Sequence, residues 1–180
     1  MSEKMNAAEE LTIAHNTEIA GYHFYTMAAA LASDPKGRNV FTHLAKEELT
    51  HIMVIGQIAE SVKSGRGWID YDTALSSGGG KILAKGAPIF QGENELVERL
   101  KTNQTDINAV NIGIEVEENA VEFYLNLLKK AVTPTEKVVL TKILEMEKNH
   151  LKILRWESES LRNTGFWCGD MEYSVEKEAE

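Results

Sequence analysis

The sequence has little cysteine and proline and no long hydrophobic run. Its one cysteine, Cys168, excludes both an internal disulfide and a four-cysteine metal site. No apolar run approaches the roughly 20 residues that span a bilayer, so we expect no membrane segment. The three prolines, Pro35, Pro88 and Pro134, lie outside the helical patterns, and no stretch alternates as a strand would. These absences predict an all-α, soluble domain.

Basic residues are also in short supply. Lysine and arginine number 19 against 28 aspartates and glutamates, which gives a net charge of −9. Nucleic-acid binding needs clustered Lys and Arg to contact phosphates, so we expect no nucleic-acid partner. The acidic N-terminal residues lack the basic-then-apolar plan of a signal peptide, which predicts a cytoplasmic protein. The length fits a single domain with a core of its own.

Apolar residues at helical spacing, together with turn signals, predict four long helices. Their expected spans are residues 7–32, 35–62, 106–131 and 134–162. Asp34 is suited to cap the second helix, and Pro35 fits its first position, where a missing N–H costs little. The run Thr133-Pro134-Thr135-Glu136 has the pattern of a capping box at the start of the fourth.

A glycine-rich segment separates the second and third long helices. Residues 64–91 contain Gly65, Gly67 and the run Gly78-Gly79-Gly80, and are expected to form a long crossover connection. A short helix is expected at about 94–101. The predicted organisation is one domain at 1–165 followed by a tail that packs partly against it. Its parts are the hairpins 7–62 and 106–162, the linker 63–105 and the tail 166–180.

Two motifs occur twice, in the same order and at the same separation. Each half of the chain contains Glu-x6-Tyr and then, 30 residues after that glutamate, Glu-x-x-His. Each residue of the first half lies 99 positions before its counterpart, as Pro35 does before Pro134. One Glu-x-x-His could arise by chance, but this paired set indicates an internal duplication of a helical hairpin. The four copies are Glu18–Tyr25, Glu48–His51, Glu117–Tyr124 and Glu147–His150.

The residue types in these motifs suit a pair of divalent cations. Positions i and i+3 lie on nearly the same face of a helix, so the Glu and His of each Glu-x-x-His point to one spot. Two hairpins packed about a pseudo-twofold axis bring both spots and the two remaining glutamates together. Four carboxylates offset the charge of two cations, whereas the same buried cluster without metal is costly. The candidate ligands are Glu18, Glu48, His51, Glu117, Glu147 and His150.

This set resembles the di-iron site of ferritin-like four-helix bundles, in which two helices give one Glu each and two give Glu-x-x-His. Over about residues 7–162 the chain resembles the rubrerythrin family of that superfamily. The resemblance implies a ferritin-like four-helix bundle with a long crossover between its second and third helices. It also implies two iron ions per chain and a homodimer. Manganese or a mixed pair suits the same ligands.

The resemblance further implies a role for each candidate residue. Glu48 and Glu147 would bridge the two irons, and Glu18 and Glu117 would be terminal ligands. Each histidine would bind one iron. Hydrogen bonds to the carboxylates, which steady metal ligands, would come from Tyr25 and Tyr124.

Two features depart from the family pattern. Classical rubrerythrins carry a four-cysteine rubredoxin domain that this chain lacks, so electrons would come from a separate protein such as a rubredoxin-like donor. Classical members also have an extra glutamate one turn from the third-helix ligand, which lets one iron move. Here Ile114 and Ala120 stand one turn from Glu117, which disfavours peroxidase chemistry by ligand switching. Glu115 and Glu118 are expected to face solvent.

The expected function is that of a non-haem di-iron oxidoreductase, peroxidase-like, which reduces hydrogen peroxide or dioxygen. Two other interpretations stay open: ferritin-like oxidation and storage or transfer of ferrous iron, and a structural bundle stabilised by metal. The remaining candidates are interpreted more plainly. His15 is expected to face solvent or cap a helix, the tryptophans to pack rather than relay electrons, and Cys168 to be a passive thiol.

Overall fold

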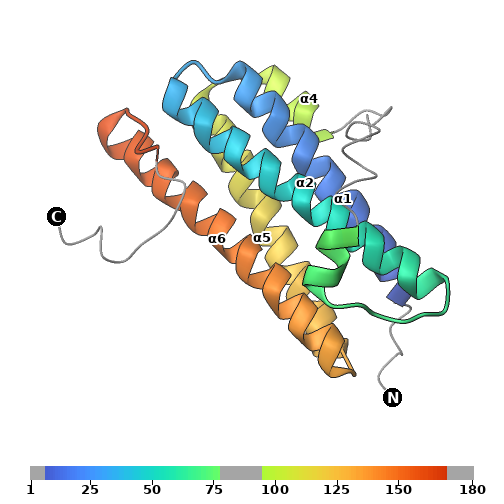
Figure 1. The fold of residues 1–180 in the computed structure, drawn as a ribbon. Helices are drawn as coiled ribbons and strands as arrows, with labels where there is room; N and C mark the ends of the chain where they lie inside the picture. The colour runs from blue at the N-terminus through green and yellow to red at the C-terminus, as the bar shows by residue number, and fades with distance from the viewer. Residues whose placement is uncertain (1–6, 78–94, 170–180) are drawn as a thin grey trace.

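Long helices make up most of the protein in the computed structural model, which describes residues 7–77 and 95–169. Within these two ranges no strand occurs, so the predicted all-α class is confirmed. None of the described helices is both long and apolar enough to cross a membrane. The helices are α1 (Ala7–Leu31), α2 (Pro35–Lys63), α4 (Glu95–Thr102), α5 (Asp106–Lys130) and α6 (Pro134–Thr164) (Figure 1).

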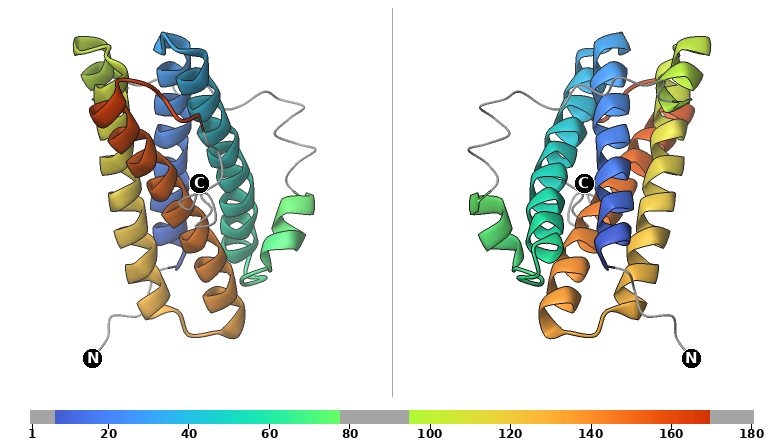
Figure 2. Two further views of the ribbon diagram at one scale, coloured as in Figure 1. Left: turned by 90° about the vertical axis from the view of Figure 1, so that its left-hand side faces the viewer. Right: turned by 90° about the vertical axis from the view of Figure 1, so that its right-hand side faces the viewer.

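The four long helices lie alongside one another as a bundle (Figures 1 and 2). α1 packs against α2 and α5 packs against α6, so the two predicted hairpins are the main packing units. The short helix α4 contacts α1 and α5. The helix bounds agree with the predicted spans to within two residues, because capping signals mark the starts of α2 and α6.

Those capping signals act as expected. The Asp34 side chain accepts the backbone N–H of Lys36 at 2.7 Å, and Pro35 opens α2. At α6, Thr133 Oγ1 accepts the backbone N–H of Glu136 at 3.3 Å, and Glu136 Oε2 accepts that of Thr133 at 3.2 Å. Each such cap satisfies donors that a helix start leaves unpaired, typically stabilising it by about 1 kcal/mol.

The predicted crossover connection after α2 contains a short helical turn that the sequence analysis did not predict. Residues 71–77 are helical, and Asp70 starts the segment by accepting the backbone N–H of Thr73 at 2.9 Å. Tyr71 and Ala74, one turn apart, are buried against the bundle. Because glycines lie on either side of it, this short amphipathic turn was not predicted from the sequence. The rest of the predicted crossover, residues 78–91, lies outside the described residues.

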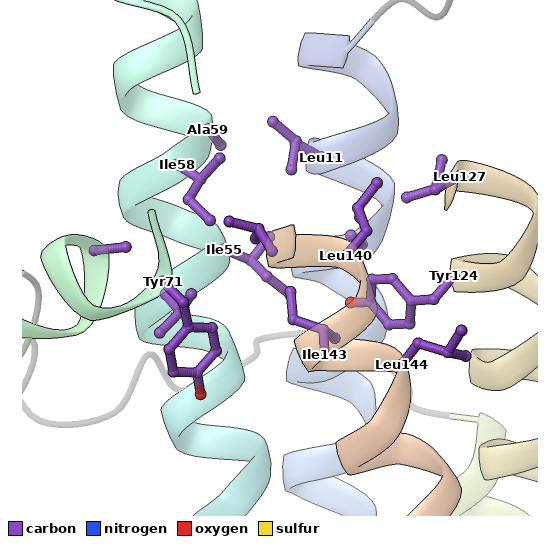
Figure 3. Packing of buried hydrophobic residues seen from close by; sticks show 14 of the residues in the cluster. Leu11, Ile55, Ile58, Ala59, Tyr71, Tyr124, Leu127, Leu140, Ile143 and Leu144 are labelled. Atoms are coloured by element: carbon purple, nitrogen blue, oxygen red, sulfur yellow. The ribbon is translucent and has the colours of Figure 1, made fainter. Parts of the chain in front are cut away.

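The apolar core consists of two clusters at opposite ends of the bundle. The Leu140 cluster lies near the α5–α6 turn and is mostly aliphatic (Figure 3). The Trp167 cluster lies near the α1–α2 turn and contains several aromatic rings. Along each long helix the buried glutamates and histidines of the repeated motifs fall between the two clusters. Members of the Leu140 cluster include Leu11, Ile55, Ile58, Tyr124, Leu140 and Ile143; those of the Trp167 cluster include Phe24, Tyr25, Phe41, Leu44 and Leu154.

After α6 the chain folds back onto the bundle. Trp167 is 3% exposed, its ring meets that of Phe41 edge-on at 5.4 Å, and its Nε1 donates to Asp106 Oδ2 at 2.8 Å. Gly37 leaves room for this ring, since a Cβ at that position would lie 2.4 Å from Trp167 Cε2. The tail therefore packs on the bundle as far as residue 169, and residues 170–180 lie outside the described part.

A buried carboxylate that the sequence did not reveal fixes this fold-back. Glu157 accepts the backbone N–H groups of Cys168 at 2.8 Å and of Gly169 at 2.7 Å. Its place seven residues after His150, two helical turns on, was a signal that it faces inward. Two charge-assisted hydrogen bonds offset the cost of burying its charge.

Substitution of Gly37 by Ala should destabilise the protein by about 1–3 kcal/mol, because the added methyl overlaps the Trp167 ring and forces it to move. In the absence of that ring the same change should be neutral or stabilise by roughly 0.5–1 kcal/mol, since Ala suits a helix better than Gly. Urea unfolding of Gly37→Ala, Trp167→Ala and the double variant tests this. Equal penalties for Gly37→Ala in both backgrounds would contradict the contact.

Candidate metal centre

The six predicted ligand residues meet in the interior, between the two apolar clusters. α1 and α5 supply one glutamate each, while α2 and α6 each supply a glutamate and a histidine one turn apart. None is more than 3% exposed, although all six are polar. The helical register that buries their apolar neighbours also turns these side chains inward: Glu18, Glu48, His51, Glu117, Glu147 and His150.

These residues form two overlapping groups, each able to hold one metal ion. Within each group the potential ligand atoms all lie within 4.8 Å of one another. Glu48 and Glu147 belong to both groups, so each can offer an oxygen to either position. Shared carboxylates of this kind are what a bridged pair of metals requires. The groups are Glu18, Glu48, His51 and Glu147, and Glu48, Glu117, Glu147 and His150.

The histidines face the shared carboxylates through their Nδ1 atoms. His51 Nδ1 lies 2.9 Å from Glu147 Oε1, and His150 Nδ1 lies 3.3 Å from Glu48 Oε1. Each histidine thus reaches the shared glutamate of the opposite hairpin. The two rings are stacked, with centroids 5.5 Å apart and planes inclined by 23°.

Two tyrosines hold the terminal carboxylates, also from the opposite hairpin. The Tyr25 hydroxyl of α1 donates to Glu117 on α5, and the Tyr124 hydroxyl of α5 donates to Glu18 on α1. Burial, then the charge of the accepting glutamate, raises the pKa of each phenol well above its usual value. Both tyrosines therefore stay protonated and can act only as donors to these carboxylates.

Without metal, the site is protonated at its outer carboxyls. Burial raises the pKa of Glu117 to about 8 and that of Glu18 well above its usual value, and nearby carboxylates add to both shifts. Burial also opposes ionisation of Glu48, but the neighbouring His150 and His51 imidazoles outweigh it and lower its pKa. Burial likewise opposes ionisation of Glu147, but the charge of His51 helps to lower its pKa, so both shared carboxylates ionise more readily than the outer ones.

The histidines complete this balance of charge. Burial acts to lower the pKa of His51, but the charge of Glu147 and hydrogen bonds to the surrounding carboxylates raise it well above its usual value. His150 follows the same pattern, with Glu117 as its strongest acidic partner. The metal-free cluster thus balances its carboxylates with protons on imidazole, in the places where cations would otherwise supply the positive charge.

Several buried nitrogen and oxygen atoms of the site make no hydrogen bond of good geometry, although Glu147 Oε1 lies close to the His51 ring. Buried polar atoms are nearly always satisfied, so a concentration of exceptions calls for an ion or another partner. The atoms are imidazole nitrogens and carboxylate oxygens, ligands that suit iron and manganese. The residues therefore fit a pair of divalent cations. Within the described part of the chain the unsatisfied atoms here are His51 Nε2, Glu117 Oε2, Glu147 Oε1 and both ring nitrogens of His150.

The positions one turn from the third-helix glutamate are apolar, as the sequence indicated. Ala120 is 5% exposed and Ile114 is partly buried. Gly21, the counterpart of Ala120 in the first half, leaves a Cβ position 3.5 Å from Glu48 Cδ. Gly21 was not among the predicted site residues, although the 99-residue offset from Ala120 locates it. Neither position supplies a further ligand.

The exposed acids near the site are engaged elsewhere. Arg99 binds Glu115 through two hydrogen bonds, at 3.0 and 2.6 Å, and Arg155 binds Glu118 at 2.8 Å. Both glutamates face solvent, as expected. His15 lies outside the metal groups and against Gly56, in a hollow between α1 and α2.

Comparison with known proteins finds a family model that matches part of the chain. The model of the rubrerythrin family matches residues 79–157, a stretch that includes Glu117, Glu147, His150 and Tyr124. No curated protein and no solved structure matches the chain. The match covers the second set of the duplicated motifs, and the first set repeats it at a constant offset. Residues 79–157 therefore resemble the family that the paired Glu and His motifs predicted.

Proposed function

We propose that this protein is a di-iron oxidoreductase of the rubrerythrin type, which reduces hydrogen peroxide or dioxygen with electrons from a separate donor protein. The observation that carries the proposal is the sharing of Glu48 and Glu147 between two metal-binding groups. Two bridging carboxylates keep a metal pair close enough to take part in one two-electron reaction. A single metal used for stability would need only one of these groups.

Each residue of the cluster has a definite task in this proposal. Glu18 with His51, and Glu117 with His150, would complete the two metal positions. Two ferrous ions bound there would supply the electrons that reduce the oxidant. The tyrosines hold the terminal carboxylates in place, which is the usual way that neighbouring donors tune metal ligands. The apolar clusters on either side keep bulk water away and favour small, weakly charged oxidants.

The need for a separate donor follows from the composition. The chain has one cysteine, so it cannot build a four-cysteine iron centre of its own. We therefore infer that the electrons that return the site to its ferrous state come from another protein, and a rubredoxin-like protein is a donor of suitable chemistry.

The first test is to load the anaerobic protein with ferrous iron and follow its absorbance after peroxide or after oxygen. We expect about two irons per chain, as the two groups require, and faster oxidation by peroxide. Glu48→Ala should lose the reaction. Glu47→Ala, the neighbouring glutamate outside both groups, should keep it.

The other outcomes separate the remaining interpretations. Faster oxidation by oxygen, together with a large closed shell of subunits in solution, would favour iron oxidation and storage. Binding of two metals that raises stability but gives no turnover would favour a structural role. Failure to bind two metals would contradict the di-iron proposal.

A further inference from the structure

A continuous line of buried aromatic rings connects the C-terminal fold-back to the metal centre. Trp167 meets Phe41 edge-on, with ring centroids 5.4 Å apart, and Phe41 is stacked with Tyr25 at 6.2 Å and 23°. The Tyr25 hydroxyl donates to the Glu117 carboxylate of the second metal group. All three rings are at most 3% exposed. Contact between rings provides a path for electron tunnelling that aliphatic packing does not provide as well.

The outer end of this line carries a group that can lose an electron and a proton together. Indole is among the most easily oxidised side chains, and an oxidised indole readily loses its N–H proton. Trp167 Nε1 donates to Asp106 Oδ2 at 2.8 Å, so an acceptor for that proton is already in place. Asp106 also accepts from Ser33 Oγ at 3.4 Å. It lies at the start of α5, away from both metal groups.

The duplication shows that the fold does not require this line of rings. Tyr124 is the counterpart of Tyr25, and the counterpart of Phe41 is Leu140, 99 residues further on. Figure 3 shows Tyr124 among aliphatic side chains, with Leu140 and Ile143 close by. Within the described part of the chain, its ring contacts that of its neighbour Phe123 and no ring on another helix. The aromatic line therefore belongs to one half of the site only.

We propose that Trp167, Phe41 and Tyr25 form a one-electron route by which Trp167 reduces the metal centre after peroxide has oxidised it. The proposal rests on the proposed function. Trp167 loses one electron, which passes through the Phe41 and Tyr25 rings to the oxidised centre, and its Nε1 proton moves to Asp106. The product is a neutral indole radical.

An external reductant then restores Trp167 by returning one electron, while Asp106 gives back the proton. The route matters when only one iron of the pair is ferrous. That iron and Trp167 then supply one electron each, and with two protons from solvent one peroxide becomes two waters. A partly loaded site thus avoids releasing a half-reduced oxygen species. The assignment goes beyond the packing role that the sequence alone suggested for Trp167.

The test follows the ferrous protein after rapid mixing with peroxide, by absorbance for the iron and by freeze-quench electron paramagnetic resonance for radicals. Protein that holds less than its full complement of ferrous iron should give a tryptophan radical after peroxide is added. Trp167→Phe should lose that signal and still bind and oxidise iron. Phe41→Leu, which copies the residue of the matched half, should lower the radical yield several-fold.

A control variant comes from the other end of the molecule. Trp68 packs against the Leu140 cluster, so Trp68→Phe should leave the radical unchanged. Mass spectrometry after repeated peroxide additions should find oxidation at Trp167 in excess of that at Trp68. Mass spectrometry needs only the unsubstituted protein, so it tests the route even if Trp167→Phe folds poorly.

The outcomes distinguish the two proposals. Iron oxidation without a tryptophan radical, or a radical that persists unchanged in both Trp167→Phe and Phe41→Leu, would overturn the electron route and leave the di-iron function standing. Equal oxidation of Trp167 and Trp68 would also overturn it. Failure of the protein to oxidise bound iron at all would overturn the proposed function and the route with it.

Discussion

Glu147→Gln should leave the protein unable to hold two metal ions. Glu147 belongs to both metal groups and lies 2.9 Å from His51 Nδ1, so its loss removes one bridge from both positions at once. Groups that only steady a metal ligand already account for about 10–100-fold in affinity, and a shared ligand should account for more than about 100-fold. Metal analysis after dialysis against ferrous iron, with isothermal titration calorimetry, measures the loss.

The matched control for this variant is Glu145→Gln on the same helix. Glu145 is exposed and pairs with Lys148 at 2.8 Å, and it belongs to neither metal group. The control removes the same charge from α6 and should retain two metals. Retention of two tightly bound metals by Glu147→Gln as well would mean that the pair is not bridged by this carboxylate.

Glu117→Gln should stabilise the metal-free protein while weakening its hold on metal. Burial raises the pKa of Glu117 to about 8, well above its ordinary value, with the charges of Glu147 and Glu48 adding to the shift. A carboxyl whose pKa is raised by folding binds its proton more tightly in the folded state. The free energy of unfolding therefore falls as pH rises from about 4.5 to about 8.

Glutamine removes this penalty and keeps an oxygen to accept the Tyr25 hydroxyl. At pH 7.5 we expect a gain on the order of 1–2 kcal/mol for the metal-free variant, with little gain at pH 4.5. Urea unfolding at the two pH values, with a chelator present, measures it. Glu118→Gln, at an exposed position paired with Arg155, should show no such pH-dependent gain. A metal-free Glu117→Gln that is less stable at high pH would refute the explanation from burial.

Much of the site could be predicted from the sequence because the duplication repeats each motif at a constant separation. The constant offset of 99 residues selected six ligand candidates from 28 acidic residues and five histidines. It also selected two tyrosines. Helix periodicity then implied that they share a face, and the structure brings them together. Local signals also fixed the helix starts, since the Asp34 and Thr133 caps depend only on adjacent residues.

What the sequence could not reveal depends on contacts between distant residues. The burial of Glu157 is explained by backbone N–H groups that a fold-back brings to it, and no local pattern specifies that fold-back. The line from Trp167 to Tyr25 joins α1, α2 and the segment after α6, and its two ends lie more than a hundred positions apart in the sequence. The helical turn at residues 71–77 was hidden because nearby glycines suggested a loop throughout.

Each metal group draws ligands from both hairpins, and the tyrosine hydrogen bonds also cross between them. Neither half of the chain therefore supplies all four ligands of either group. We expect metal uptake to depend on docking of the hairpins, because a chain whose hairpins have not docked offers no complete group of four ligands. The same arrangement fits an ancestral hairpin that worked as a symmetric pair before the two copies were joined in one chain.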